Sequence, residues 1–178
     1  MQTTSFGSNA IKFGLFIGLF NIVLSLIYYV FDVNMFSTGF MIGNIVLSLI
    51  IVISFFVFGI KSYRNTGLAG KITFLQAFTQ GIAIGIIAYL IIGVYQYVFT
   101  AYIAPDYMAS QLEKFIDFME GFGMPDEALD AAVEEFKKNL PPAKAMLAQF
   151  KNGGIMTVIV SLLIAAFIKK DTTEATIA

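Results

Sequence analysis

Residues 40–60 read FMIGNIVLSLIIVISFFVFGI, which is 21 consecutive residues without a charged side chain. An α-helix rises 1.5 Å per residue, so about 20 apolar residues cross the roughly 30 Å hydrocarbon core of a bilayer. The stretch therefore predicts a membrane-spanning helix.

Three further charge-free runs predict three more spans. Residues 13–31 form a run of 19, residues 72–105 carry no charge, and residues 153–168 form a run of 16. The last run is short, but the helix-forming segment 143–150 can extend it. The first run is too long for a signal peptide and lacks its cleavage motif. We expect one all-α integral membrane domain over 1–178, a bundle of four transmembrane helices at about 12–31, 40–60, 74–103 and 150–168.

The composition excludes several classes of function. Apolar residues make up 58% and charged residues 13% of the chain, which leaves too few polar groups to cover a soluble surface. The absence of Cys and His removes thiol nucleophiles, common zinc sites and imidazole catalysis. A net charge of −1 gives no field that attracts nucleic acid. We expect no catalytic residue, no metal, no cofactor and no nucleic-acid partner, with the lipid bilayer as the surroundings.

The basic residues predict the orientation. Lys and Arg in short loops mark the cytoplasmic side. With four spans, both termini and the loop between spans two and three share one side, and the six Lys and Arg residues of these flanks all fall there: Lys12, Lys61, Arg64, Lys71, Lys169 and Lys170. Both termini are therefore expected in the cytoplasm.

The segment 104–149, between spans three and four, is expected outside the cytoplasm. Residues 104–152 carry nine acids against five lysines, and large apolar residues recur in them at helical spacing. We expect two amphipathic helices, at about 106–121 and 126–139, because Gly121–Pro125 breaks the pattern and Pro141-Pro142 ends it. They should form a hairpin that caps the spans, with four side chains facing inward: Phe115, Met119, Val133 and Phe136.

Residues 59–81 and 102–108 carry a family resemblance. The first reads GIKSYRN followed by Gly67, Gly70, ITF, QAF and Gly81, and the second reads YIAPDYM. Together with the long helical loop and the closing Lys169-Lys170, the chain resembles the domain-of-unknown-function 4199 family over essentially its whole length. The resemblance implies a small four-span protein of the bacterial cytoplasmic (inner) membrane, and it implies no activity.

Glycines and uncharged polar residues inside the spans are the candidate contact residues. Three G-x-x-x-G pairs place two glycines on one helix face: Gly14–Gly18, Gly39–Gly43 and Gly81–Gly85. They predict close packing within the bundle or a dimer face. The heptapeptide NIVLSLI occurs at 21–27 and at 44–50. Its polar residues, Asn21, Ser25, Asn44 and Ser48, predict a hydrogen-bonded clamp between neighbouring helices or a ligand-lining face.

The third span adds Gln76, Gln80 and Gln96. Thr73 and Gln76 fit a capping box at its start. Capping and interface hydrogen bonds are one interpretation of these glutamines, and a polar stripe for a permeant is the other.

Two functions remain open. The charge-free spans disfavour ion-coupled transport. We expect a non-enzymatic membrane protein that acts through protein interaction, in the membrane or at its outer face, with a protein partner or a homo-oligomer. The alternative is a small transporter or channel subunit that works as an oligomer. A continuous polar cavity touching Asn21, Asn44, Gln80 or Gln96 would favour the alternative.

Overall fold

The computed structural model describes residues 4–170. The elements in chain order are α1 (Phe6–Val30), α2 (Thr38–Ser62), the π-helical turn η1 (Tyr63–Gly67), α3 (Phe74–Val98), the π-helical turn η2 (Phe99–Ile103), α4 (Tyr107–Gly121), α5 (Asp126–Lys138) and α6 (Pro142–Ile168). The helices are joined by turns and loops, and among the described residues an isolated bridge pairs Ile72 with Lys170.

Four helices are long and apolar enough to cross a membrane: α1, α2 with η1, α3 with η2, and α6. They contain the four charge-free runs of the sequence. The fourth helix begins at Pro142, so it includes the segment 143–150 that the sequence allowed as an extension. Thr73 caps α3 and forms with Gln76 the capping box that the sequence predicted.

The helix α3 is the centre of the bundle, with α6 and α1 packed along it. Small residues make this approach possible, since a Cβ atom added at Gly85 would overlap the side chain of Thr157 on α6. On the other side of α3, a Cβ atom at Gly14 would lie 2.7 Å from the side chain of Ile87. The lack of a side chain at these glycines thus sets how closely the helix backbones approach one another.

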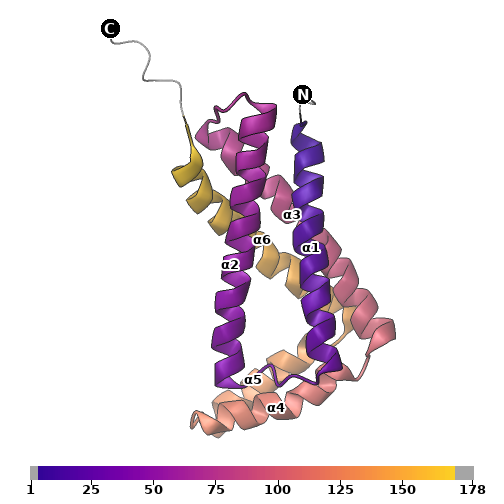
Figure 1. The fold of residues 1–178 in the computed structure, drawn as a ribbon. Coiled ribbons are helices and arrows are strands. Elements are labelled where there is room, and N and C mark those ends of the chain that lie inside the picture. Colours follow the sequence, from indigo (N-terminus) through magenta and orange to yellow (C-terminus); the bar gives the residue numbers. More distant parts are fainter. Residues whose placement is uncertain (1–3, 171–178) are drawn as a thin grey trace.

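The two ends of the bundle differ in packing. The buried residues of α1 stop at Gly18, and those of α2 begin only at Phe56. The helices α1 and α2 therefore pack into the bundle at one end and diverge towards the other (Figure 1). We call the packed end, where α1 starts and α6 stops, the closed end, and the end where α1 and α2 diverge the open end.

The helices α4 and α5 lie across the open end (Figure 1). Phe36, in the loop between α1 and α2, packs against Phe115 of α4 and Phe136 of α5, with ring centroids 5.2 Å and 6.1 Å away. Lys114 of α4 donates a 2.8 Å hydrogen bond to Asp32 of the same loop. These contacts tie α4 and α5 to the loop that joins α1 and α2.

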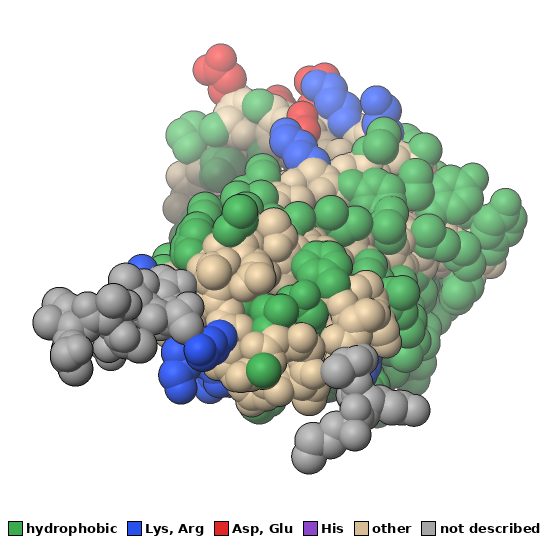
Figure 2. Space-filling view, turned by 90° about the horizontal axis from the view of Figure 1, so that it is seen from above, with side chains coloured by type: hydrophobic (Ala, Val, Ile, Leu, Met, Phe, Trp, Pro, Cys, Tyr) green, Lys and Arg blue, Asp and Glu red, His purple; other side chains and the backbone are tan. Residues whose placement is uncertain are grey.

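Basic and acidic side chains are distributed unevenly between the closed and the open end. The view from the closed end shows Lys and Arg side chains on that face, apolar side chains around the flanks, and acidic side chains together with lysines at the more distant margin (Figure 2). The basic residues of this face come from α2, η1, the following loop and the end of α6. The acids belong mainly to α4 and α5.

Candidate functional site: polar cavities at the open end

A cavity of about 140 Å³ lies between the diverging parts of α1 and α2. We call it the α1–α2 cavity. Met35 of the connecting loop and Tyr107 of α4 complete its wall. The two helices contribute the four polar positions of the repeated heptapeptide, which are Asn21, Ser25, Asn44 and Ser48. Leu24 and Tyr28 of α1 add one apolar and one aromatic side chain.

A second cavity of about 330 Å³ adjoins the first, and we call it the α4–α6 cavity. The two cavities share Ser25, Met35 and Tyr107. The second one adds four further amide side chains, from α3, the end of α5 and α6: Gln96, Asn139, Gln149 and Asn152. Asn139 and Asn152 are exposed, so this cavity reaches the surface. No lining residue of either cavity is an acid, a lysine or an arginine.

Hydrogen bonds across helices hold part of this lining in place. The Tyr28 hydroxyl of α1 donates a 2.9 Å hydrogen bond to Oδ1 of Asn44 on α2. The Tyr95 hydroxyl of α3 donates a 3.2 Å hydrogen bond to Oγ of Ser25. The amide nitrogen of Asn44 and the hydroxyl hydrogen of Ser25 are not used in these two bonds, so both remain donors for another group.

Tyr107 is the aromatic anchor of the site. Its ring packs edge-on against Tyr29 and Phe99, with centroids 5.1 Å and 5.8 Å away. Its hydroxyl is buried and has no hydrogen-bond partner among the described residues. Burial raises the pKa of Tyr107, and the nearby Asp32 and Tyr95 raise it further. The hydroxyl therefore stays protonated at neutral pH and can donate a hydrogen bond.

The expected clamp between the two heptapeptides differs from what the structure shows. Asn44 pairs with Tyr28 and not with Asn21, and Asn21 is exposed. The reason is the divergence of α1 and α2, which opens the space where the two polar faces would have met. These faces line the α1–α2 cavity instead, together with Ser25 and Ser48.

The three glutamines of α3 have three different surroundings. Gln76 is exposed at the helix start. Gln80 is fully buried at the closed end, where its Nε2 donates a 3.4 Å hydrogen bond to the carbonyl of Phe6. Gln96 alone lines a cavity. They form no continuous polar stripe.

Two of the three predicted glycine pairs lie in helix contacts. Gly14 and Gly18 face the side chains of Ile87 and Ile91 on α3, and Gly81 and Gly85 face Ser161 and Thr157 on α6. In contrast, nothing among the described residues lies within 4 Å of a Cβ atom built at Gly39 or Gly43. Their part of α2 is the diverging part, where Phe40 and Asn44 contact Tyr28 of α1 and the glycines face no other helix.

The closed end blocks the polar cavities from continuing through the protein. Its fully buried side chains include Phe56, Ile60 and Ile84, one from α3 and two from α2. Asn9 of α1 is also fully buried, and its Nδ2 donates a 2.8 Å hydrogen bond to the carbonyl of Gly59. The polar groups here serve helix contacts and line none of the cavities described above.

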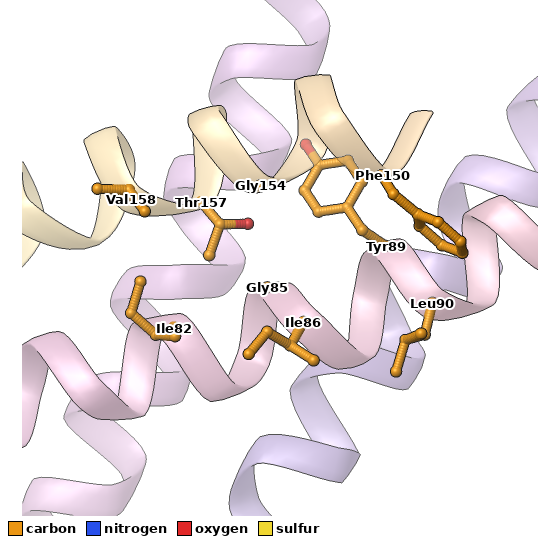
Figure 3. Close-up of a pocket in the computed structure, with 9 residues that line it drawn as sticks. All are labelled: Ile82, Gly85, Ile86, Tyr89, Leu90, Phe150, Gly154, Thr157 and Val158. Atoms are coloured by element: carbon orange, nitrogen blue, oxygen red, sulfur yellow. The ribbon is translucent and has the colours of Figure 1, made fainter. Parts of the chain in front are cut away.

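A groove of different character runs between α3 and α6 (Figure 3). Its volume is about 360 Å³, and the side chains of Ile86, Leu90 and Val158 make it mainly apolar. Gly85 and Gly154 leave the space that the groove occupies. In a bilayer such a surface suits acyl chains, so it is not a polar site.

Several structurally important residues were missed from the sequence. On α6, Gly153, Thr157, Ser161 and Ala165 are all buried at a spacing of four, opposite the glycines of α3. The signal was present as a small-residue repeat, which a search for glycine pairs does not find. Nothing in the sequence indicated that the hydroxyl of Tyr107 is buried.

Comparison with known proteins gives a family and no activity. No curated protein and no solved structure matches the chain. A family model described as "Protein of unknown function (DUF4199)" matches residues 12–170, from the second turn of α1 to the end of α6. The chain therefore belongs to the domain-of-unknown-function 4199 family.

Proposed function

We propose that the protein is an integral, non-enzymatic protein of the bacterial cytoplasmic membrane, which binds an uncharged polar ligand in the cavities of its open end. Both termini lie in the cytoplasm under this proposal. The support for the orientation is the basic closed end and the acidic helices at the open end, since Lys and Arg flanking spans favour the cytoplasmic side. The open end then faces outward.

The observation that carries the proposal is the polar lining of the α1–α2 cavity. Asn21, Asn44 and Ser48 belong to mainly apolar helices that are long enough to cross a membrane. Under this proposal they lie at membrane depth. Acyl chains cannot form hydrogen bonds with these side chains, and an unsatisfied polar group in hydrocarbon is costly. An occupant with hydroxyl or amide groups, or water, satisfies them.

The cavity changes the balance between the two functions expected from the sequence. It touches Asn21 and Asn44, and the adjoining α4–α6 cavity touches Gln96. These contacts favour the binding of a small molecule over protein interaction alone. Transport by an oligomer is the second candidate. It is supported by the arrangement itself, because a site open on one side and closed on the other is one state of an alternating-access cycle.

Cysteine labelling tests the proposal cleanly, because the chain has no native cysteine. A water-borne methanethiosulfonate reagent modifies thiols that contact water and spares thiols in lipid. In reconstituted protein, Ser48→Cys in the cavity should react, whereas Ile45→Cys, an exposed apolar position of the same helix outside the cavity lining, should not. Equal protection of both cysteines would show that lipid tails fill the gap and would refute the proposal.

A further inference from the structure

We infer that the ligand is the uncharged, hydroxyl- or amide-bearing head group of a membrane amphiphile, which enters the α1–α2 cavity sideways from the outer leaflet. The inference rests on the proposed function and adds the chemistry of the ligand and its route.

The route follows from what covers the cavity and what does not. Towards the outside, Met35 and Tyr107 stand in its wall, and α4 and α5 lie across the end of the bundle (Figure 1). The Phe36 contacts and the bond from Lys114 to Asp32 hold this cover in place. Apart from Met35 and Tyr107, the cavity lining comes from α1 and α2, and Asn21 of α1 is exposed, so the cavity opens sideways between the two helices. Water and small reagents reach the site through the neighbouring α4–α6 cavity, whereas a molecule with acyl chains has the lateral opening.

The flanks of the cavity match an amphiphile. Ile45 and Leu47 on α2 are exposed apolar side chains within one helical turn of Asn44 and Ser48, one on each side of that polar face. A soluble polar molecule would cover only the polar groups. An amphiphile covers both, because its head group bonds to the polar lining while its chains lie along the apolar flanks.

The absence of formal charge in the lining selects a neutral head group. The potential partners are the amides of Asn21 and Asn44, the hydroxyls of Ser25 and Ser48, and the unpartnered hydroxyl of Tyr107. A phosphate or carboxylate would lose its hydration here and gain no cation in exchange, which is strongly unfavourable. Hydroxyl and amide groups can be satisfied by these donors and acceptors.

The size and depth of the site favour a small head group. The volume of about 140 Å³ resembles cavities of about 150 Å³ that hold a benzene-sized molecule. Asn21 precedes the last residue of α1, Val30, by nine positions, which is about 14 Å at 1.5 Å per residue. The site thus extends well below the membrane surface. A glycerol-sized group on two acyl chains fits both measures.

The test uses three lipids with the same acyl chains and the full chain in phosphatidylcholine nanodiscs. Dioleoylglycerol carries one free hydroxyl, triolein carries none, and dioleoylphosphatidic acid carries a charged phosphate. Native mass spectrometry of the released protein measures the bound lipid. The variant is Tyr107→Phe, which removes a hydroxyl that makes no bond within the fold. The matched control is Tyr102→Phe, at an exposed tyrosine that lines neither cavity.

We expect dioleoylglycerol to bind in preference to the other two lipids. Loss of one hydrogen bond in Tyr107→Phe should weaken this binding about fivefold, and Tyr102→Phe should leave it unchanged. Added dioleoylglycerol should also protect Ser48→Cys from the thiol reagent, whereas glycerol added in water should not.

Four results would overturn the inference: preference for phosphatidic acid, equal binding of triolein, equal protection by aqueous glycerol, or no lipid protection together with crosslinking of Asn44→Cys between two copies. The last result would assign the gap to a helix of a second copy. In each case Ser48→Cys still reports whether the cavity is wet, so failure of the lipid inference and failure of the proposed function are distinguishable.

Discussion

Substitution of the packed glycine Gly85 by alanine should destabilise the bundle, whereas the same change at Gly43 should not. Each is the second glycine of a G-x-x-x-G pair. A Cβ atom at Gly85 would overlap the side chain of Thr157, so α3 and α6 must separate to admit it. A Cβ atom at Gly43 meets nothing within 4 Å among the described residues.

The expected difference between the two variants can be estimated. Overpacking a close contact costs about 1–3 kcal/mol, and replacing Gly by Ala inside a helix gains up to about 1 kcal/mol. The helix gain applies to both variants and cancels in their difference. Gly85→Ala should therefore be about 1–3 kcal/mol less stable than Gly43→Ala.

Equilibrium unfolding in mixed micelles, followed by far-ultraviolet circular dichroism, measures the free energies of unfolding. The additional change Thr157→Ala removes two of the three atoms that the new Cβ atom would meet, so the double variant should recover part of the loss. Equal stability of Gly85→Ala and Gly43→Ala would refute the account of glycine packing given above.

Three further predictions concern the cover, the closed end and the tyrosine of the site. Phe136→Asp should release α4 and α5 from the loop between α1 and α2, at a cost of about 2–4 kcal/mol from lost burial and ring contacts. Amide hydrogen exchange should then be faster in both helices. The control Glu134→Gln, on the solvent side, should leave the exchange rates unchanged. Asn9→Leu should lower the free energy of unfolding by about 0.6 kcal/mol, the average for hydrogen bonds in membranes. Asn21→Leu should not lower it, because Asn21 is exposed and no hydrogen bond of its side chain is found among the described residues. A larger loss of stability for Asn21→Leu than for Asn9→Leu in denaturant titrations would contradict this assignment. The raised pKa of Tyr107 means that the folded state holds the hydroxyl proton more tightly than the unfolded state, so its contribution to stability is complete below the ordinary pKa of 10.0 and declines as pH rises through the folded-state pKa. In alkaline buffer the wild type should therefore lose stability relative to Tyr107→Phe. Parallel curves of unfolding free energy against pH for the two proteins would show that the hydroxyl is not buried.

The helices were predictable because their signals are local. Charge-free runs of sufficient length predicted three of the four helices that can span a membrane, and a shorter run extended by the helix-forming segment 143–150 predicted the fourth. The amphipathic periodicity and the Gly121–Pro125 break predicted helices at 106–121 and 126–139, and the structure has α4 at Tyr107–Gly121 and α5 at Asp126–Lys138. The capping box of Thr73 and Gln76 was confirmed for the same reason, since all its partners lie within four residues.

The cavities were only partly predictable, because their form depends on how far helices separate. The sequence identified Asn21, Ser25, Asn44 and Ser48 as one kind of face, and all four line one cavity. It indicated direct pairing of these faces as the first interpretation, because periodicity gives a helix face but not the distance to its neighbour. That distance follows from glycine contacts present at the closed end and absent around Gly43.

The role of Tyr107 could not have been found from its own surroundings in the sequence. Its position is fixed by ring contacts to Tyr29 and Phe99, which lie in other elements of the chain. The pairing of Lys114 with Asp32 is likewise set by contacts between segments far apart in the sequence. Such long-range contacts have no periodic signature.

The side from which the cavity is reached is the most direct test of the account. Single cysteines at Ser48, at Ala128 on α5 and at Asn65 in η1 can be treated with a membrane-impermeant thiol reagent, first on intact cells with a permeabilised outer membrane and then on inside-out vesicles. Ala128→Cys and Asn65→Cys are exposed controls for the two sides. The account predicts that Ser48→Cys and Ala128→Cys react on intact cells, and that only Asn65→Cys reacts on inside-out vesicles. Reaction of Ser48→Cys on inside-out vesicles, or on neither preparation, would contradict an outward-facing polar cavity.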